Sequence, residues 1–254
     1  MPGSFDDKGH LLIADGRIIS CFGKKRSGKS IMGMLLFQSY PGDRIVIDVA
    51  GDDGPMGKDV HLLKGDVTNL PRRWPEYLRE DKEQITLRYV PDPGSATRLE
   101  DVDAIIGLAL THGNCAVLIH ETNYVAPAGR VPPHMNRLLH QNRHRHVTAI
   151  LCDPRPLTVD ALVLAQSDLV YIFEVNVVQD REKIAKTIGW SVRDFSDDVE
   201  ELGAHEYLRF DSNQPKPAPD DEHDYRLVHF SALPADVVAK TKRWAHGGQQ
   251  RKGI

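Results

Sequence analysis

The sequence predicts an α/β fold, a three-layer sandwich in which helices cover both faces of a mostly parallel central sheet. Short, continuously apolar runs alternate with segments whose apolar residues recur at helical spacing, which is the pattern of strands and crossover helices in such a fold. The first apolar run also passes through a glycine-containing turn directly into a helical segment. Together these observations predict the order of elements along the chain.

The first half of the chain contains three expected strands and two expected helices. The strands are residues 17–22, 44–48 and 85–90, each a short apolar run bounded by Gly, Pro or Asp residues. The first helix follows the glycine-containing turn and ends before Pro41, since proline cannot continue a helix. The second helix, residues 99–110, has its apolar side chains on one face.

The second half repeats this alternation. Strands are expected at residues 115–120, 147–152 and 169–173, and helices at residues 135–144 and 159–165. After residue 213 the character of the sequence changes: residues 214–219 are Pro-rich, residues 220–224 are acidic, and residues 236–254 carry five basic residues against one acid. We therefore expect a main domain at residues 1–213 and a C-terminal extension at residues 214–254, with a basic, mobile tail.

Composition limits the possible functions. The 254 residues are 41% hydrophobic, enough for a substantial core, and their formal net charge of −4 excludes a protein that binds nucleic acid with its whole surface. Cys21, Cys115 and Cys152 lie in or beside apolar runs, so we expect buried thiols and a cytoplasmic location. No apolar run reaches the ~18 residues that span a bilayer, and no signal peptide is recognisable.

The segment 23–30 reads Gly-Lys-Lys-Arg-Ser-Gly-Lys-Ser and matches the phosphate-binding pattern G-x-x-x-x-G-K-[ST] at every position. Its glycines let backbone N–H groups turn toward the β- and γ-phosphates, Lys29 adds positive charge, and the Ser30 hydroxyl binds Mg²⁺. The helix that follows points its N-terminus at the anion. We therefore predict a P-loop NTPase of the RecA-like (ASCE) type that binds ATP and Mg²⁺. The predicted nucleotide-binding residues are Gly23, Lys24, Lys25, Arg26, Ser27, Gly28, Lys29, Ser30 and Ile31.

A second acidic site is expected where the strand at residues 115–120 ends in His120 and is followed by Glu121. P-loop ATPases usually have Asp-Glu here, the Asp orienting magnesium through water and the Glu polarising the attacking water. Glu121 is therefore the predicted catalytic base, whereas His120 is a poor partner for hard Mg²⁺. Three hypotheses stay open: His120 accepts a hydrogen bond from a magnesium-bound water, Asp48 supplies the missing carboxylate, or hydrolysis is slow and the protein chiefly binds nucleotide.

The stretch between residues 138 and 173 carries a further set of motifs. A helix ends in Asn142-Arg143-His144-Arg145, a buried strand follows, a turn contains Arg155-Pro156, and Gln166-Ser167-Asp168 leads into the last strand. With the phosphate-binding segment, their order and spacing over residues 17–173 resemble the HerA/FtsK superfamily of DNA-pumping ATPases. The family has a polar residue and Gln where this chain has Asp153 and Pro154. Within the superfamily the chain is most similar to the genome-packaging ATPases of membrane-containing icosahedral viruses, with zonula occludens toxin-like proteins as close relatives.

This resemblance implies an ATP-driven translocase that pumps double-stranded DNA during viral genome packaging. It implies a homo-oligomeric ring, usually a hexamer, in which an arginine of the neighbour stabilises charge on the γ-phosphate. Arg143 aligns best with that role and Arg145 second, although both could equally lie on a solvated helix end. The implied location is the host cytoplasm or the packaging vertex of a virion, with capsid or membrane proteins as partners and no transmembrane segment in the chain.

Other interpretations stay open at this point. The chain could be an export ATPase that acts on virion proteins, or a nucleotide-binding structural subunit with little turnover. The adjacent cations Lys24, Lys25 and Arg26 could surround the triphosphate or face a neighbouring subunit. A compact basic-aromatic group at residues 72–74 could contact DNA phosphates, or it could be an exposed turn.

Overall fold

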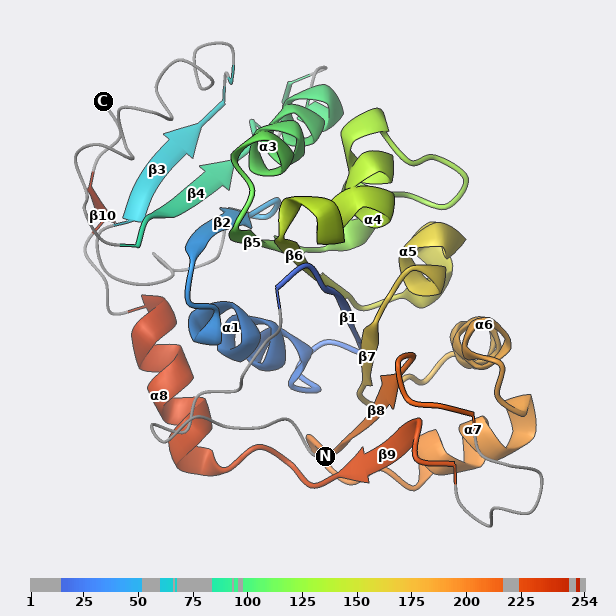
Figure 1. The fold of residues 1–254 in the computed structure, drawn as a ribbon. Helices are drawn as coiled ribbons and strands as arrows, with labels where there is room; N and C mark the ends of the chain where they lie inside the picture. Colours follow the sequence, from blue (N-terminus) through green and yellow to red (C-terminus); the bar gives the residue numbers. More distant parts are fainter. Residues whose placement is uncertain are drawn as a thin grey trace.

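A computed structural model of the chain describes residues 15–51, 60–65, 67, 84–92, 94–95, 98–216, 224–246 and 250–251. The basic-aromatic group at residues 72–74 and the last residues of the expected tail lie outside these ranges. In the described part, strands and helices alternate along most of the chain and form three layers (Figure 1).

The strands of the described part form one ten-stranded sheet in the order β10-β3-β4-β2-β5-β6-β1-β7-β8-β9. The strands are β1 (Ile18–Phe22), β2 (Asp43–Ile47), β3 (Val60–Lys64), β4 (Thr86–Val90), β5 (Cys115–His120), β6 (Val147–Asp153), β7 (Leu169–Ile172), β8 (Tyr207–Asp211), β9 (Leu227–Phe230) and β10 (Gln250–Arg251). Neighbours from β10 to β7 pair in parallel, whereas β8 runs antiparallel to both β7 and β9. The mostly parallel sheet expected from the sequence is therefore confirmed.

Helices cover both faces of this sheet (Figure 1). They are α1 (Lys29–Ser39), α3 (Arg98–His112), α4 (Pro133–Arg145), α5 (Ala161–Ala165), α6 (Val178–Ile188), α7 (Val192–Glu200) and α8 (Ala235–His246). Helices α3 to α7 supply the apolar core of one face, and α1 and α8 supply that of the other. None of the helices within the described ranges is both long enough and apolar enough to cross a membrane.

Strand β5 shows why the strands read as continuous apolar runs. Val117 and Ile119 lie in the core shared with α3 and α4, while Ala116 and Leu118 lie in the core shared with α1. Every residue of β5 is buried, because a parallel sheet with helices on both faces leaves no solvent face to a central strand. Cys115 also belongs to this strand, and all three cysteines are buried free thiols, as expected.

The segment beyond residue 213 contributes to the same layers. Strand β9 pairs with β8, and helix α8 packs on α1, where the rings of Trp244 and Phe37 meet edge to face with centroids 6.2 Å apart. The guanidinium of Arg44 lies over the Trp244 ring, 5.7 Å from its centroid. Helix α8 thus stands beside the helix that follows the phosphate-binding segment. The division into two domains at residue 213 stays a prediction.

Candidate active site

Residues 23–28 of the phosphate-binding segment connect β1 to α1 at the carboxyl edge of the sheet, and Lys29 and Ser30 begin α1. Gly28 has φ 113°, a conformation that favours glycine, and precedes Lys29, the first residue of α1. A Cβ atom on Gly23 would lie 2.6 Å from Cβ of Phe173 and 2.7 Å from Oγ of Ser27. No side chain caps the N-terminus of α1, so its first N–H groups are available to an anion.

A cavity of about 190 Å³ opens beside this segment and brings together the residues that the sequence singled out. It is lined by Lys25, Lys29, Ser30, Asp48, Ala50, His120, Glu121, Cys152 and Pro154. The strands explain this convergence, because β2, β5 and β6 are parallel neighbours and therefore end at the same edge of the sheet. We call this space the small cavity.

Glu121 enters the small cavity from the residue directly after β5. Its backbone is left-handed, with φ 60° and ψ 60°, a conformation that costs a non-glycine residue roughly 1–2 kcal/mol. Such local strain occurs most often at functional sites. The left-handed turn ends the strand and begins the short helix Thr122–Tyr124.

His120 is buried at the end of β5. Burial lowers its pKa to about 4, with Lys29 acting in the same direction and the carboxylates of Asp48 and Glu121 opposing it. The imidazole is therefore neutral near pH 7 and contributes no charge to the small cavity.

Asp48 lies at the end of β2, and its charge is already compensated within the protein. Nε of Arg88 donates a hydrogen bond to Oδ2 of Asp48 at 3.1 Å, and both side chains are buried. The backbone N–H of Gly51 donates to Oδ1 at 2.8 Å. Arg88 and the Gly51 amide thus help to hold Asp48 in place.

Asp153 is the last residue of β6. Its carboxylate accepts hydrogen bonds from the backbone N–H groups of Asn123 at 2.7 Å and Arg155 at 2.8 Å. Burial nevertheless raises its pKa to about 6. The Arg155 side chain turns away and donates from Nε to Asp180 at 2.7 Å, so Arg155 is an ion-paired turn residue.

A larger cavity, of about 370 Å³, also borders the phosphate-binding segment. Its apolar wall combines Ile31, Phe173, Ala232, Leu233 and Val238, and its remaining lining is Arg26, Gly28, Lys29, Ser30, His205 and Lys242. Nδ1 of His205 lies 3.1 Å from the carbonyl oxygen of Ser27, which ties this wall to the segment. Lys29 and Ser30 line both cavities, so a ligand bound there could extend in both directions. Sequence motifs gave no signal for the wall that residues 232–242 provide.

Arg143 lies at the opposite edge of the sheet from the phosphate-binding segment. It stands in the last turn of α4, before β6 begins, whereas the segment follows the end of β1, which is parallel to β6. A five-residue strand such as β1 spans about 16 Å. Arg143 therefore cannot reach the small cavity of its own chain.

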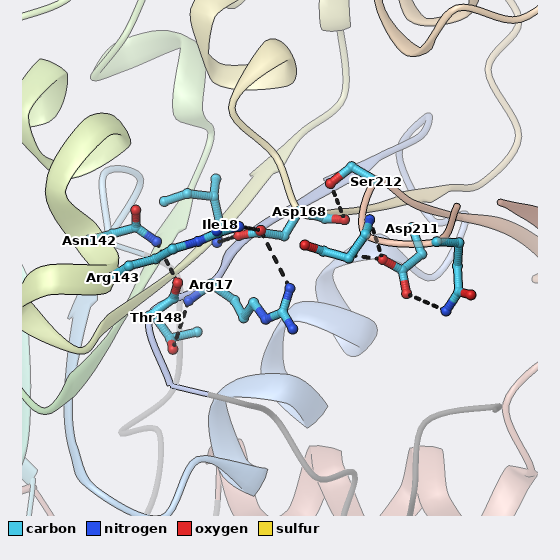
Figure 2. Close-up of polar contacts among 11 residues, drawn as sticks. Arg17, Ile18, Asn142, Arg143, Thr148, Asp168, Asp211 and Ser212 are labelled. Atoms are coloured by element: carbon cyan, nitrogen blue, oxygen red, sulfur yellow. Dashed lines mark hydrogen bonds and ion pairs between the residues drawn. The ribbon is translucent and has the colours of Figure 1, made fainter. Parts of the chain in front are cut away.

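A buried carboxylate holds Arg143 at that edge (Figure 2). Asp168 forms ion pairs with Arg143 and with Arg17, the latter at 3.4 Å, and its Oδ2 accepts the backbone N–H of Ile18 at 2.8 Å. The Arg143 side chain is nevertheless 65% exposed. Asp168 thus anchors a guanidinium that remains open to solvent or to another molecule.

Comparison with solved structures connects this site to a known fold. The genome packaging NTPase B204 from Sulfolobus turreted icosahedral virus 2, in complex with AMPPCP, matches with a TM-score of 0.62 and 18% identity over 87% of this chain and 100% of that one. B204 from Sulfolobus turreted icosahedral virus, described as a DNA-packaging ATPase, matches with a TM-score of 0.62 and 19% identity over 87% and 100%.

Similarity to the N-terminal domain of zonular occludens toxin from Neisseria meningitidis is much slighter, with a TM-score of 0.39 and 18% identity over 63% of this chain and 77% of that one. No protein-family model and no curated protein sequence matches the chain. At the identities found with B204, the comparison shows a shared fold. The chain has the α/β sandwich fold of P-loop NTPases, as the sequence predicted.

Proposed function

We propose that this chain is an ATPase that takes part in viral genome packaging by translocating double-stranded DNA. The observation that carries the proposal is the convergence of Lys29, Ser30 and Glu121 on one small cavity at the N-terminus of α1. A fold shared with a packaging NTPase whose structures include complexes with AMPPCP and ATP-gammaS supports it.

The residues that carry the proposal have different chemical roles. Lys29 and the free N–H groups of α1 bind the β- and γ-phosphates. Glu121, which lines the same cavity, accepts a proton from the water that attacks the γ-phosphorus. The low pKa of the buried His120 makes its imidazole a weak base, and we assign the proton transfer to the carboxylate of Glu121.

Mg²⁺ fits the donors at this position. The Ser30 hydroxyl and the carboxylate of Asp48 are hard oxygen donors of the kind that Mg²⁺ prefers. Across the described ranges, no group of three or more His, Cys, Asp or Glu residues could hold a metal by itself, so the phosphates of ATP would supply most of the ligands. Bound Mg²⁺ would neutralise charge on the β- and γ-phosphates.

The larger cavity suits the nucleoside end of ATP. It meets the phosphate-binding segment on the side of Gly28 and Ile31, and its wall is mainly apolar, as expected for a site that receives a flat base. Lys242 and Arg26 line the same cavity and can face the ribose and the α-phosphate. In this arrangement the triphosphate crosses Lys29 and Ser30 and ends in the small cavity.

We also propose that the working form is a homo-oligomeric ring, usually a hexamer in ATPases of this kind, with Arg143 completing the site of the neighbour. Its distance from its own phosphate-binding segment supports a role in another subunit, and its anchoring by Asp168 supports a fixed position. A ring would gather weak basic surfaces around a central pore, which makes a net charge of −4 compatible with duplex DNA. The site of action would be the packaging vertex of a virion in the host cytoplasm, with capsid or membrane proteins as docking partners.

The neutral His120 favours one rival, a nucleotide-binding subunit with little turnover. Measuring ATP turnover with and without duplex DNA distinguishes the translocating ATPase from this subunit. The proteins compared are the wild type, Glu121→Gln and Lys29→Ala, and Lys186→Ala on the exposed surface of α6 is the control. We expect turnover to rise with duplex DNA, and to fall by roughly 10²–10⁴-fold in Glu121→Gln while ATP binding persists. Lys29→Ala should lose ATP binding or turnover.

Each other outcome would change the proposal. Wild-type turnover in Glu121→Gln would show that Glu121 is not the base. Turnover that ignores DNA would favour an ATPase that exports virion proteins, and ATP that is bound but not hydrolysed would favour the structural subunit.

A further inference from the structure

The phosphate-binding segment contains three adjacent cations, Lys24, Lys25 and Arg26, and their side chains go to three different places. Lys24 forms an ion pair with Glu174, and its backbone N–H donates to the Glu174 carbonyl at 2.8 Å. Arg26 lines the larger cavity. Lys25 alone of the three lines the small cavity, together with Lys29 and Glu121.

Lys25 forms neither a hydrogen bond nor an ion pair with any residue of the described part. Glu174, which contacts the segment from just beyond the end of β7, is already paired with Lys24. Of the two carboxylates that line the small cavity, Asp48 is compensated by the buried Arg88, which leaves Glu121. Lys25 and Lys29 therefore line the small cavity together with one carboxylate, Glu121, that no arginine among the described residues compensates.

We propose that Lys25 is a catalytic residue that contacts the γ-phosphate of ATP, supplied by the same chain as the phosphate-binding segment. This inference rests on the proposed ATPase function. The base and ribose occupy the larger cavity, so the far end of the triphosphate reaches the small cavity, where Lys25 and Glu121 stand. ADP ends before that point and does not meet Lys25.

The step that Lys25 assists is hydrolysis of the terminal phosphoanhydride. The water oxygen forms a bond to the γ-phosphorus, the bond from that phosphorus to the β–γ bridging oxygen breaks, and the water proton passes to Glu121. ADP leaves with the electron pair of the broken bond, and inorganic phosphate leaves with the water oxygen. The Lys25 side chain stabilises the negative charge that develops on the γ-phosphoryl oxygens.

The test compares Lys25→Ala and Lys25→Arg with the wild type and with the surface control Lys186→Ala. Steady-state kinetics give kcat and KM, and titrations in EDTA give the affinities for ATP and ADP without metal or turnover. Lys25→Ala should lower kcat by roughly 10²–10³-fold, the range seen when one preorganised donor to a transition state is removed. Its affinity for ATP should fall about tenfold while its affinity for ADP changes less than about twofold, because Lys25 meets only the γ-phosphate. Lys25→Arg should recover at least about a tenth of kcat, since it retains the charge.

Three results would overturn the assignment. One is an unchanged kcat in Lys25→Ala, and another is an equal loss of ATP and ADP affinity, which would mean a general electrostatic effect. The third is a loss of kcat in Lys25→Ala that is reversed at higher protein concentration, in parallel with a recovery of assembly measured by light scattering. That result would place Lys25 at a subunit contact. If the wild type hydrolyses no ATP, the proposed function fails, and the ratio of ATP to ADP affinity still decides whether Lys25 meets the γ-phosphate.

Discussion

Gly33, in the middle of α1, packs directly against the sheet. A Cβ atom built on Gly33 would lie 2.6 Å from Sγ of Cys152 on β6, with the next atoms, from Leu118 and Ile150, at 3.4 and 3.8 Å. Since non-bonded heavy atoms prefer about 3.5–4.0 Å, Gly33→Ala must displace the helix or the thiol. Overpacking of this kind costs about 1–3 kcal/mol, against about 1 kcal/mol gained from replacing glycine within a helix.

A double-mutant cycle separates these two contributions to the free energy of unfolding. Gly33→Ala should destabilise the wild type by up to about 2 kcal/mol, whereas in a Cys152→Ala background it should stabilise by about 1 kcal/mol, because the obstructing sulfur is gone. The helix-propensity gain appears in both backgrounds, so the coupling energy of about 1–3 kcal/mol measures the overpacking alone. Urea unfolding of the four proteins, followed by far-UV circular dichroism, supplies the four free energies. A coupling below about 0.5 kcal/mol would refute the close packing of α1 on β6.

Two further predictions concern the polar residues at either edge of the sheet. Folding lowers the pKa of His120 from 6.5 to about 4. Between these pH values the unfolded chain binds a proton at His120 and the folded chain does not, so the free energy of unfolding decreases as the pH falls from 6.5 toward 4. His120→Asn lacks this proton uptake, so its free energy of unfolding should rise by about 3 kcal/mol relative to that of the wild type as the pH falls from 7 to 4. Urea unfolding at the two pH values measures this, and an equal loss of stability in both proteins would contradict the shifted pKa. Arg143→Ala should change the free energy of unfolding by no more than about 1 kcal/mol, since the side chain is largely exposed, yet lower turnover by about 10³-fold or more if it acts in a neighbour. Mixing Arg143→Ala with Lys29→Ala subunits should then restore part of the turnover, and a mixture as inactive as its components would argue against a role between subunits.

The sequence predicted the central strands because their burial is nearly complete. The six expected strands correspond to β1, β2, β4, β5, β6 and β7, with ends that differ by at most one residue. Strands buried on both faces carry long apolar runs, which a sequence displays directly. The phosphate-binding segment was equally legible, because its glycines and its lysine are set by close backbone contacts and by charge.

The outer elements were missed for the opposite reason. Only Thr241 and Ala245 are fully buried in helix α8. Its sequence is therefore dominated by the basic residues of its solvent-exposed face, a pattern that predicts a cationic tail. Strand β9 has no fully buried residue and gives no clear apolar run. The wall that α8 and the segment before it supply to the larger cavity could not be foreseen, since it depends on how these weakly patterned elements pack on α1 and β8.

The presence of histidine instead of an acidic residue at position 120 is consistent with the charges that surround this position. Asp48 and Glu121 line the small cavity. Asp153 lies close to Glu121: burial is the main cause of its raised pKa, and the charge of Glu121 raises the pKa of Asp153 further. Against these three carboxylates stand Lys25, Lys29 and the buried Arg88. An aspartate at position 120 would add a fourth carboxylate to the end of a site that must accept a triphosphate, whereas a neutral, buried imidazole adds none. The departure at position 120 thus preserves the charge balance of a polyphosphate site, with Glu121 left to act as the base.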